Sequence, residues 1–578
     1  MQNTIKAAKN GKYARSPWVE IAALAVSAIL GYAGLAIVSA LQKAQPADAQ
    51  INLNNTGTAL SGANTLNAVT QNSSAINSAA NNEMAAGTIS LILFVFFLLS
   101  AGIAILSVMA GIGGGVIFTP IMLAFTSVNS IVVRGAGLIV AMFSGPVSTG
   151  IFTKKGIANY RLNLIMTISQ GLGALAGANL AVATAAGAGA TGEGLMRFAL
   201  GLILLLLAAY FLKGGAKLEW PPEGKADGFT RRLRLDGRYY EESEGVVKEY
   251  KVKRAPLGII LIFIVGVIGG FFGMGGGWAI TPVLNLGMGL PLKLAAANSG
   301  IILGIGSCAS IWPYIYAGSL IPLFILPWAA GQVAGGFAGS YLLARVKVRV
   351  VRLILIGVMI ITSFSLLTKG LEILNIIGGV SHLTHVAVFL ITAAVILLFI
   401  FRDNKKKTSQ GSEQRITAIP ARKPINTGLP RFARNDGEGT DQIPKSNLIF
   451  GNVVYWIIIV CAAAMLILPA IILAAPDANM LHPNIIFGEI FAGASPRQIW
   501  SRSAAGDFPG AHFYIGNLNL ADGWAMLFMN IGCGVGFFGL AAAVIYQITK
   551  EKDWFCAILG AALSAMILLS ATGVLNMY

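Results

Sequence analysis

Charged and histidine side chains are scarce in this chain of 578 residues. Only 11% of the residues are Asp, Glu, Lys or Arg, and there are 4 histidines, against 56% hydrophobic residues. So few charges exclude a soluble globular protein of this size. Apolar runs of about 18 residues or more recur, each long enough to cross a hydrocarbon core of roughly 30 Å. The sequence therefore predicts an all-α integral membrane protein, a polytopic helix bundle of roughly 12–14 spans.

Motifs for catalysis and metal binding are also missing. The sequence contains no HExxH, CxxC or Walker A motif, and no chain order that would support a Ser-His-Asp triad. The cysteines lie in or beside apolar runs without metal-ligand spacing, so we interpret them as small buried hydrophobic residues: Cys308, Cys461, Cys533 and Cys556. We expect no metal, no cofactor and no enzymatic activity.

The net charge of +17 raises the question of nucleic-acid binding, but its placement argues against it. Residues 213–255 hold eleven Lys or Arg and residues 402–447 hold ten, both between apolar runs. Membrane proteins keep such loops in the cytoplasm. The base-poor segments 42–87 and 476–523 are expected outside. We therefore predict a lipid bilayer as the partner, with no nucleic acid.

The N-terminus carries Lys6, Lys9, Lys12 and Arg15 before an apolar stretch of about 23 residues. This pattern fits either a signal peptide cleaved after Ala49 or an uncleaved first span. The apolar stretch exceeds the roughly 7–15 residues of a signal peptide. We favour an uncleaved span and keep the cleaved form as the alternative.

Two glycine-rich decapeptides interrupt apolar runs. Residues 111–120 read GIGGGVIFTP and residues 273–282 read GMGGGWAITP, with six identical positions at an offset of 162 residues. Each glycine costs a helix about 1 kcal/mol relative to Ala, so both runs should break there. The same offset aligns Gln170 with Gln332 and Gly156 with Gly318. We predict two copies of one structural unit, over roughly 88–214 and 250–370.

The charges of equivalent loops predict that the two copies are inverted in the membrane. Lys154 and Lys155 make one loop of the first copy basic, whereas the counterpart of that loop at residues 316–317 is neutral. The segment 184–193 has no base, but its counterpart carries Arg345, Lys347, Arg349 and Arg352. A swap of positive charge is expected when equivalent loops face opposite sides.

The glycine breaks have two interpretations. Glycines can simply allow close helix packing, which we favour for the GxxxG pairs Gly173/Gly177 and Gly335/Gly339. Unpaired backbone at membrane depth is tolerated only against protein or water, and its free N–H groups favour an anion. For the two GxGGG breaks we favour the anion site, since paired broken segments in inverted halves mark a substrate site. A dinucleotide-binding loop lacks the required βαβ context.

Polar residues near the breaks complete the candidate site, because polar groups inside a membrane are expensive. Gln170 and Gln332 either donate to the anion or brace the broken helices. Arg134 and Lys293 either guide the anion or extend toward the interface. The predicted substrate-binding residues are Gly111, Gly113, Gly114, Gly115, Thr119, Gly273, Gly275, Gly276, Gly277, Thr281, Gln170, Gln332, Asn298, Ser299, Arg134 and Lys293.

Both decapeptides, each followed by a helix of small residues (RGAGLIVAMFSG and AAANSGIILGIG), resemble the sulfite exporter TauE/SafE family of anion permeases. The resemblance covers about residues 88–370. It implies transport of a small sulfur-containing or organic anion, such as sulfite or an organosulfonate, across the cytoplasmic membrane. The chain departs from the family pattern by an extra N-terminal span, the loops 42–87 and 213–255, and three spans after residue 450.

The leading hypothesis is a secondary transporter in which two units move against each other by alternating access. The alternative is a non-transport subunit or enzyme of a membrane complex, with the C-terminal spans as the working part; an anion channel is a third class. Homo-oligomerisation is left open. The expected segments are 1–87 (span and polar loop), 88–214 (first repeat), 215–255 (basic loop), 256–401 (second repeat and one span), 402–449 (basic linker) and 450–578 (three-span extension).

Overall fold

The computed structural model describes most of the chain after residue 85. The described residues are 86–187, 189–213, 227–241, 246–342, 348–378, 443–504 and 506–576, with single positions at 384, 388 and 392. The spans predicted at 18–40 and 385–401 lie outside these ranges, apart from the three single positions. Almost all of the described secondary structure is helical, which confirms the predicted fold class.

The helices of the first unit follow the predicted apolar runs. They are α4 (Ala86–Ala110), α5 (Gly115–Phe125), α6 (Ser130–Lys154), α7 (Tyr160–Gly187) and α8 (Gly189–Lys213). The second unit repeats the order with α10 (Ala255–Phe272), α11 (Gly277–Pro282), the π-helical η3 (Val283–Gly287), α12 (Leu292–Ser310), α13 (Trp312–Tyr316), α14 (Pro322–Leu342) and α15 (Val348–Ile373).

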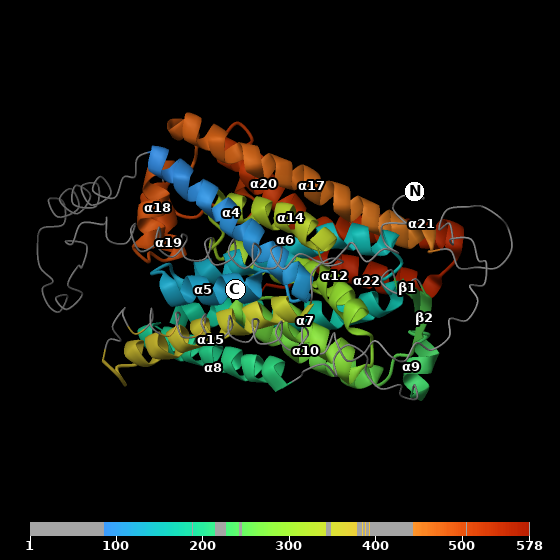
Figure 1. Cartoon of the computed structure of the whole chain (residues 1–578). Coiled ribbons are helices and arrows are strands. Elements are labelled where there is room, and N and C mark those ends of the chain that lie inside the picture. Colours follow the sequence, from blue (N-terminus) through green and yellow to red (C-terminus); the bar gives the residue numbers. More distant parts are fainter. Residues whose placement is uncertain are drawn as a thin grey trace, which may run out of the picture.

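The C-terminal module lies along one side of the two units (Figure 1). Its members are α17 (Lys445–Ala474), η4 (Pro476–Ala478), α18 (Pro483–Phe491), α19 (Pro496–Ser503), η5 (Phe513–Gly516), α20 (Ala521–Cys533), α21 (Val535–Tyr546), η6 (Gln547–Glu551) and α22 (Trp554–Ala571). The segment predicted as an outside loop, 476–523, is thus folded. Ser495 and Gln498 form a capping box that starts α19.

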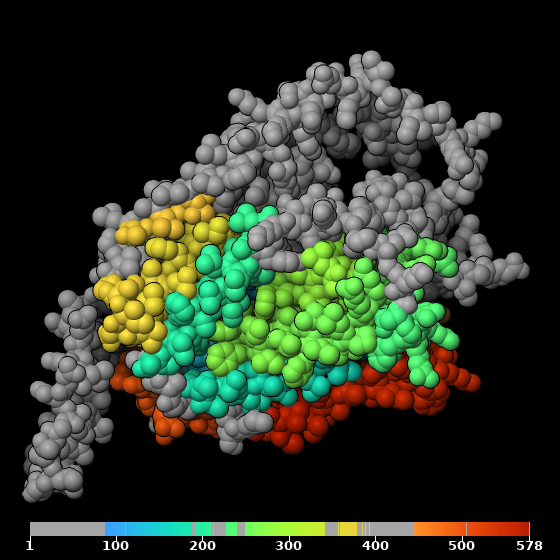
Figure 2. All heavy atoms as spheres, turned by 90° about the horizontal axis from the view of Figure 1, so that it is seen from below, coloured from blue at the N-terminus to red at the C-terminus, as the bar shows by residue number. Residues whose placement is uncertain are grey.

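The described residues contain 8 helices long and apolar enough to cross a membrane, or 9 if the pair α20–α21, bent by 47°, counts as one span. The predicted 12–14 spans include two that lie outside the described residues, and α5 and α11 are too short to be counted as spans. Leucine and isoleucine side chains of α8 and α10, such as Leu206 (63% exposed) and Ile260 (59% exposed), face outward. Figure 2 shows α15, α8 and α10 on this face, as expected of a lipid-facing surface.

The basic segment between the two units contains a small folded element, although the sequence predicted only a loop. The short helix α9 (Gly228–Leu233) precedes an antiparallel hairpin of β1 (Gly237–Glu241) and β2 (Val246–Tyr250). Asp227 caps α9 and accepts a hydrogen bond from the Thr230 hydroxyl, which lowers the pKa of the Asp227 carboxyl. The hairpin marks one end of the molecule (Figure 1), here called the hairpin end.

The two units exchange helices in their packing. Helix α7 of the first unit packs against α10 of the second, and α14 of the second packs against α4 of the first. The GxxxG glycines lie at these contacts. Gly173 meets the backbone of Phe263 and Gly177 that of Val267. At the offset of 162 residues, Gly335 meets Ala101 and Gly339 meets Ile105. These contacts support the close-packing interpretation of the GxxxG pairs.

Each glycine break turns the chain back instead of completing a crossing. Helix α5 has 11 residues, about 16 Å of helix, and covers half of the membrane. Its end meets the C-terminal module, where Ser127 approaches Gly493. In the second unit, the Lys253 amide just before α10 donates to Met288 O just after η3 (2.9 Å). Both breaks therefore sit at the tips of re-entrant helical hairpins.

Equivalent turns of the two units contact different parts of the chain. Gly156 lies beside Ile443, next to α17, and the neighbouring Asn159 donates to Leu235 O before the hairpin (2.8 Å). Its counterpart Gly318 accepts a hydrogen bond from the Trp500 indole of α19 (2.8 Å). Figure 1 shows the hairpin and α19 at opposite ends of the bundle. This arrangement fits the inverted repeat, which stays a prediction.

The inversion predicts opposite accessibility of two equivalent positions. In membrane vesicles of known orientation, Lys155→Cys should react with a membrane-impermeant maleimide from the cytoplasmic side only. Ala317→Cys should react from the other side only, since the positive-inside rule assigns the loops that way. The measurement is the labelled fraction after reagent is added to each side. Labelling of both positions from the same side would refute the inverted arrangement.

Candidate functional site

The two glycine breaks have the same backbone conformation. Positive φ angles occur at Gly111 (68°) and Gly113 (76°), and at their counterparts Gly273 (66°) and Gly275 (68°). Side chains other than glycine rarely adopt this left-handed conformation. The GxG spacing of both motifs is therefore explained by two left-handed turns that end α4 and α10.

Reciprocal hydrogen bonds join the two breaks. Thr119 Oγ1 of α5 donates to Gly273 O (2.8 Å), and Thr281 Oγ1 of α11 donates to Gly111 O (2.7 Å). The offset of 162 residues maps one bond onto the other. Such an exchange is what a local two-fold relation produces, as at an isologous interface. The sequence placed both threonines near the site, and the structure gives them this joining role.

The breaks also touch through their backbones. A Cβ on Gly115 would lie 2.8 Å from Met274 O, and a Cβ on its counterpart Gly277 would overlap Ile112 O. Ile112 and Met274 are themselves equivalent at the same offset. The fifth residue of each motif therefore needs to be glycine, because the opposite glycine break lies directly against it.

Several amides at the breaks lack partners. The N–H groups of Gly115 and Val116, and those of Gly276 and Gly277, form no hydrogen bond within the described residues. All four residues are buried. Unpaired N–H groups at this depth are costly, and they attract an anion at a helix start. This is the chemical feature on which an anion site can be built.

The two predicted glutamines are fully buried but are used differently. Gln332 Nε2 donates to the Ser100 carbonyl and hydroxyl (3.0 Å each), and its Oε1 lies beside Gly114 without a partner among the described residues. Gln170 lies against Gly306 of α12, and neither atom of its amide has a hydrogen bond within the described chain. Each glutamine therefore keeps hydrogen-bonding capacity inside the bundle.

The predicted polar residues of α12 separate into two groups. Ser299 Oγ donates to Gly111 O (3.0 Å) and so belongs to the first break. Asn298 instead accepts from the Asn159 amide (2.8 Å) and donates to Ile157 O (3.2 Å), which ties α12 to the turn after α6. Lys293 lies in the first turn of α12, away from the contacts between the breaks.

Arg134 is buried beside the second break. Its side chain is 3% exposed, and Nη1 donates to Phe271 O (3.3 Å), the penultimate residue of α10. Nε donates to Ser130 O (3.3 Å), and the guanidinium carbon lies 5.5 Å from the centre of the Phe271 ring. Of the two interpretations of Arg134, extension toward the interface does not fit this burial, and a role in guiding the anion stays a prediction.

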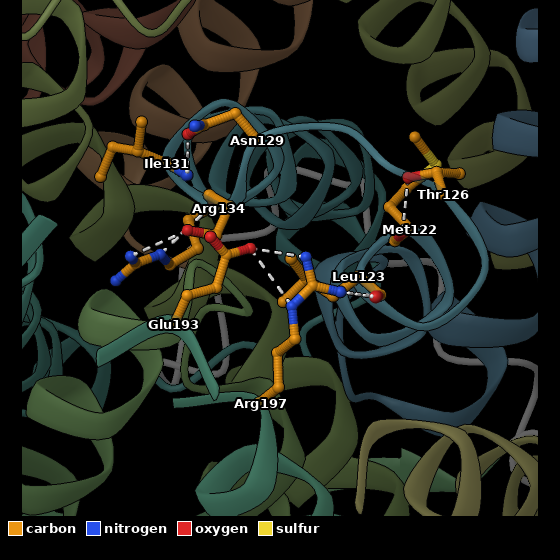
Figure 3. Close-up of polar contacts among 9 residues, drawn as sticks. Met122, Leu123, Thr126, Asn129, Ile131, Arg134, Glu193 and Arg197 are labelled. Carbon is orange, nitrogen blue, oxygen red and sulfur yellow. Dashed lines mark hydrogen bonds and ion pairs between the residues drawn. The ribbon is translucent and has the colours of Figure 1, made fainter. Parts of the chain in front are cut away.

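An ion pair near Arg134, between a buried arginine and a half-buried glutamate, was missed by the sequence analysis. Arg197 of α8 pairs with Glu193 (2.6 Å) and also donates to Leu123 O near the end of α5. Figure 3 shows both arginines flanking Glu193. The i, i+4 spacing of Glu193 and Arg197 within an apolar run was the available signal.

A small cavity lies at the first break. Its volume is about 10 Å³, roughly the space of one water molecule. The lining comes from α4, the break, α6 and α12: Ser107, Val108, Gly111, Gly113, Ser144, Gly145, Ser148, Phe152, Ala296, Gly300 and Leu303. Of the predicted site residues only Gly111 and Gly113 line it. The cavity contains hydroxyl and backbone groups but no charged side chain.

A larger, open pocket of about 440 Å³ lies at the hairpin end, where the first unit, the hairpin and the C-terminal module meet. Two contacts tie the C-terminal module there: Arg161 pairs with Asp553 (3.0 Å), and Ser446 Oγ donates to Glu551 (2.6 Å). Partial burial raises the pKa of Asp553, but the hydrogen bond and charge of Arg161 together with the hydrogen bonds from Cys556 outweigh it and lower that pKa overall. None of the predicted site residues lines this pocket.

These features define a multi-pass membrane protein built around two broken helices. Residues 94–366 match the family model described as sulfite exporter TauE/SafE, so this segment of the chain is similar to that family of membrane transporters. The predicted family and membrane location are thereby confirmed. A second family model, which carries no functional description, matches residues 446–574.

A curated relative agrees with this assignment. The probable membrane transporter protein YunE of Bacillus subtilis (strain 168) is 25% identical over 268 residues, which cover 45% of this chain and 92% of the relative. No solved structure matches the chain. The family match at residues 94–366 covers the two units and ends before the C-terminal module.

The reciprocal bonds predict unequal effects of two equivalent substitutions. Thr119→Val leaves Gly273 O without a side-chain donor and should destabilise the protein by about 1–3 kcal/mol. Thr281→Val should cost less, because Ser299 still donates to Gly111 O. The measurement is thermal unfolding of the detergent-solubilised protein.

The double variant Thr281→Val/Ser299→Ala is the matched control and should approach the loss seen for Thr119→Val. Equal unfolding temperatures of wild type and Thr119→Val would contradict the proposed bond.

Proposed function

We propose that the protein is a secondary transporter that moves a small anion, a sulfur oxyanion or organosulfonate such as sulfite, across the cell membrane by alternating access. The observation that carries the proposal is the pair of re-entrant breaks joined by reciprocal hydrogen bonds, with unpaired amides on both. Backbone N–H groups can only donate hydrogen bonds, and hydroxyls can donate as well as accept. Both kinds of group therefore favour an anion. The family description supports the sulfur-oxyanion class.

Alternating access is the movement that this architecture favours. Each unit contributes one break, and each break contacts helices of the other unit, so a shift between the units changes both breaks together. Helix pairs joined by glycines can slide or rock with small backbone changes. The sequence has no Walker A motif, so the driving force is the gradient of the anion, the membrane potential or a coupled ion.

The membrane potential favours export. An anion that leaves a cell with a negative interior gains roughly 2.3 kcal/mol per charge per 100 mV. Uptake of the same anion needs a coupled cation or proton. The proposal is therefore export of the anion by default, with uptake only where coupling is demonstrated.

The proposal predicts substrate-dependent flux in proteoliposomes. The purified chain should transport at least one of labelled sulfite, thiosulfate, sulfoacetate and sulfate, and an inside-negative potential should accelerate efflux. Gly276→Leu should abolish this flux, since the new side chain fills the space at the second break beside Ile280 and Val265.

Gly287→Leu is the matched control, because a Cβ at Gly287 meets only Val283, at 3.8 Å. It should insert normally and keep its flux. Full transport by Gly276→Leu, or no flux of any of the four anions in the wild type, would count against the proposal.

A further inference from the structure

The two breaks differ in what fills the space beside them. At the offset of 162 residues, Arg134 corresponds to Ala296, and Tyr314 corresponds to Phe152. Ala296 and Phe152 both line the small cavity at the first break. The equivalent space at the second break contains a guanidinium and a phenol instead. The two halves therefore differ at positions that border the candidate path.

The backbone around these positions is nevertheless equivalent. A Cβ on Gly111 would lie 2.6 Å from the Cβ of Ala296, and a Cβ on Gly273 would overlap the backbone of Arg134. In each half, the first glycine of the break is thus in contact with the equivalent helix of the other unit, α12 for Gly111 and α6 for Gly273. The difference lies in the side chains alone, so it cannot be attributed to a different arrangement of the helices.

Arg134 and Tyr314 close the end of α10. The Tyr314 hydroxyl donates to Gly270 O (2.8 Å), and Arg134 Nη1 donates to Phe271 O (3.3 Å). Both side chains are buried, with 3% and 0% exposure. In the first half the corresponding residue, Val108, lines the cavity, and neither Phe152 nor Ala296 can donate to its carbonyl through a side chain.

The cavity and this closed position lie toward opposite ends of the bundle. Phe152 is close to the end of α6 and to Gly156, which contacts Ile443 at the hairpin end. Tyr314 is close to Gly318, which accepts the hydrogen bond from Trp500 of α19. One route to the breaks is therefore left as a small cavity, and the equivalent route from the α19 end is filled.

The charge of Arg134 suits an anion path. Ser130 and the Phe271 carbonyl accept its hydrogen bonds, and Glu193 lies nearby but is already paired with Arg197. The guanidinium is therefore held by neutral groups, and an anion is a stronger partner for it than a carbonyl. Figure 3 shows Arg134 beside Glu193, which lies between Arg134 and Arg197.

We propose that Arg134 and Tyr314 form the gate of the anion path at the α19 end, and that opening this gate frees the Arg134 guanidinium to bind the anion. The proposal rests on the transport function proposed above and adds the residues that close one side. The gate is asymmetric because the other side, with Ala296 and Phe152, has no equivalent hydrogen bonds to α10 or α4.

Accessibility of Ser310 tests the gate without any substrate. Ser310 is the counterpart of Ser148, which lines the cavity, and Ser310 is fully buried. The four native cysteines are also buried, so the chain without the reporter serves as the blank. The reporter Ser310→Cys is labelled with a membrane-impermeant maleimide from the α19 side, and its rate is compared among gate variants.

Tyr314→Phe and Arg134→Ala install the residues found in the other half. Each should raise the labelling rate of Ser310→Cys by about tenfold, since a hydrogen bond that holds the gate closed is lost. Tyr316→Phe is the matched control: its hydroxyl bonds Ala571 O (3.0 Å), outside the gate, and its rate should equal that of the wild type. Thermal unfolding of every variant checks that the fold is retained.

Unchanged labelling in both gate variants, with retained folding, would overturn the gate. Faster labelling in a protein that transports none of the four anions would support the gate and refute the proposed substrate class. Unchanged labelling in a protein that does transport sulfite would refute the gate and leave the transport function intact. A rise in Tyr316→Phe equal to that in Tyr314→Phe would also overturn the gate, because it would show general loosening.

Discussion

This structure depends on one constraint. Backbone groups that are freed where a helix is interrupted inside a membrane must find hydrogen-bond partners. Ending a helix at that depth exposes carbonyl and amide groups that lipid cannot bind. Here the carbonyl of Gly111 is satisfied by Thr281 and Ser299, and that of Gly273 by Thr119. Each unit therefore completes the break of the other, while several amides stay unpaired. The close helix pairs and the re-entrant hairpins position the groups that make this exchange.

Much of the architecture was readable from the sequence, because its signals are local or repeated. The apolar runs predicted the helices, and the shared motif predicted the family resemblance. The two repeated units inferred from the 162-residue offset stay a prediction. The sequence could not predict which carbonyl each threonine hydroxyl bonds, because Thr119 and Gly273 meet only through the packing of the two re-entrant helical hairpins. The role of Asn298 was also hidden, because its partner Asn159 comes from another turn.

The departures from symmetry carry the most functional information. The first break borders a small cavity, and the second is closed by a tyrosine and an arginine that have no counterparts in the first half. The C-terminal module adds to this asymmetry, since Trp500 covers Gly318 while nothing comparable is bonded to Gly156 within the described residues. In the proposed alternating-access cycle, these few side chains would decide which side of the breaks is closed.

The location of the bound anion is the most direct test of the central claim. Selenite, the selenium analogue of sulfite, can be located by its anomalous scattering in crystals of the full chain. The account predicts a peak between the two breaks, within about 3 Å of the unpaired amides near Gly115 and Gly277. A selenium peak found only elsewhere, in a protein shown to transport selenite, would contradict it.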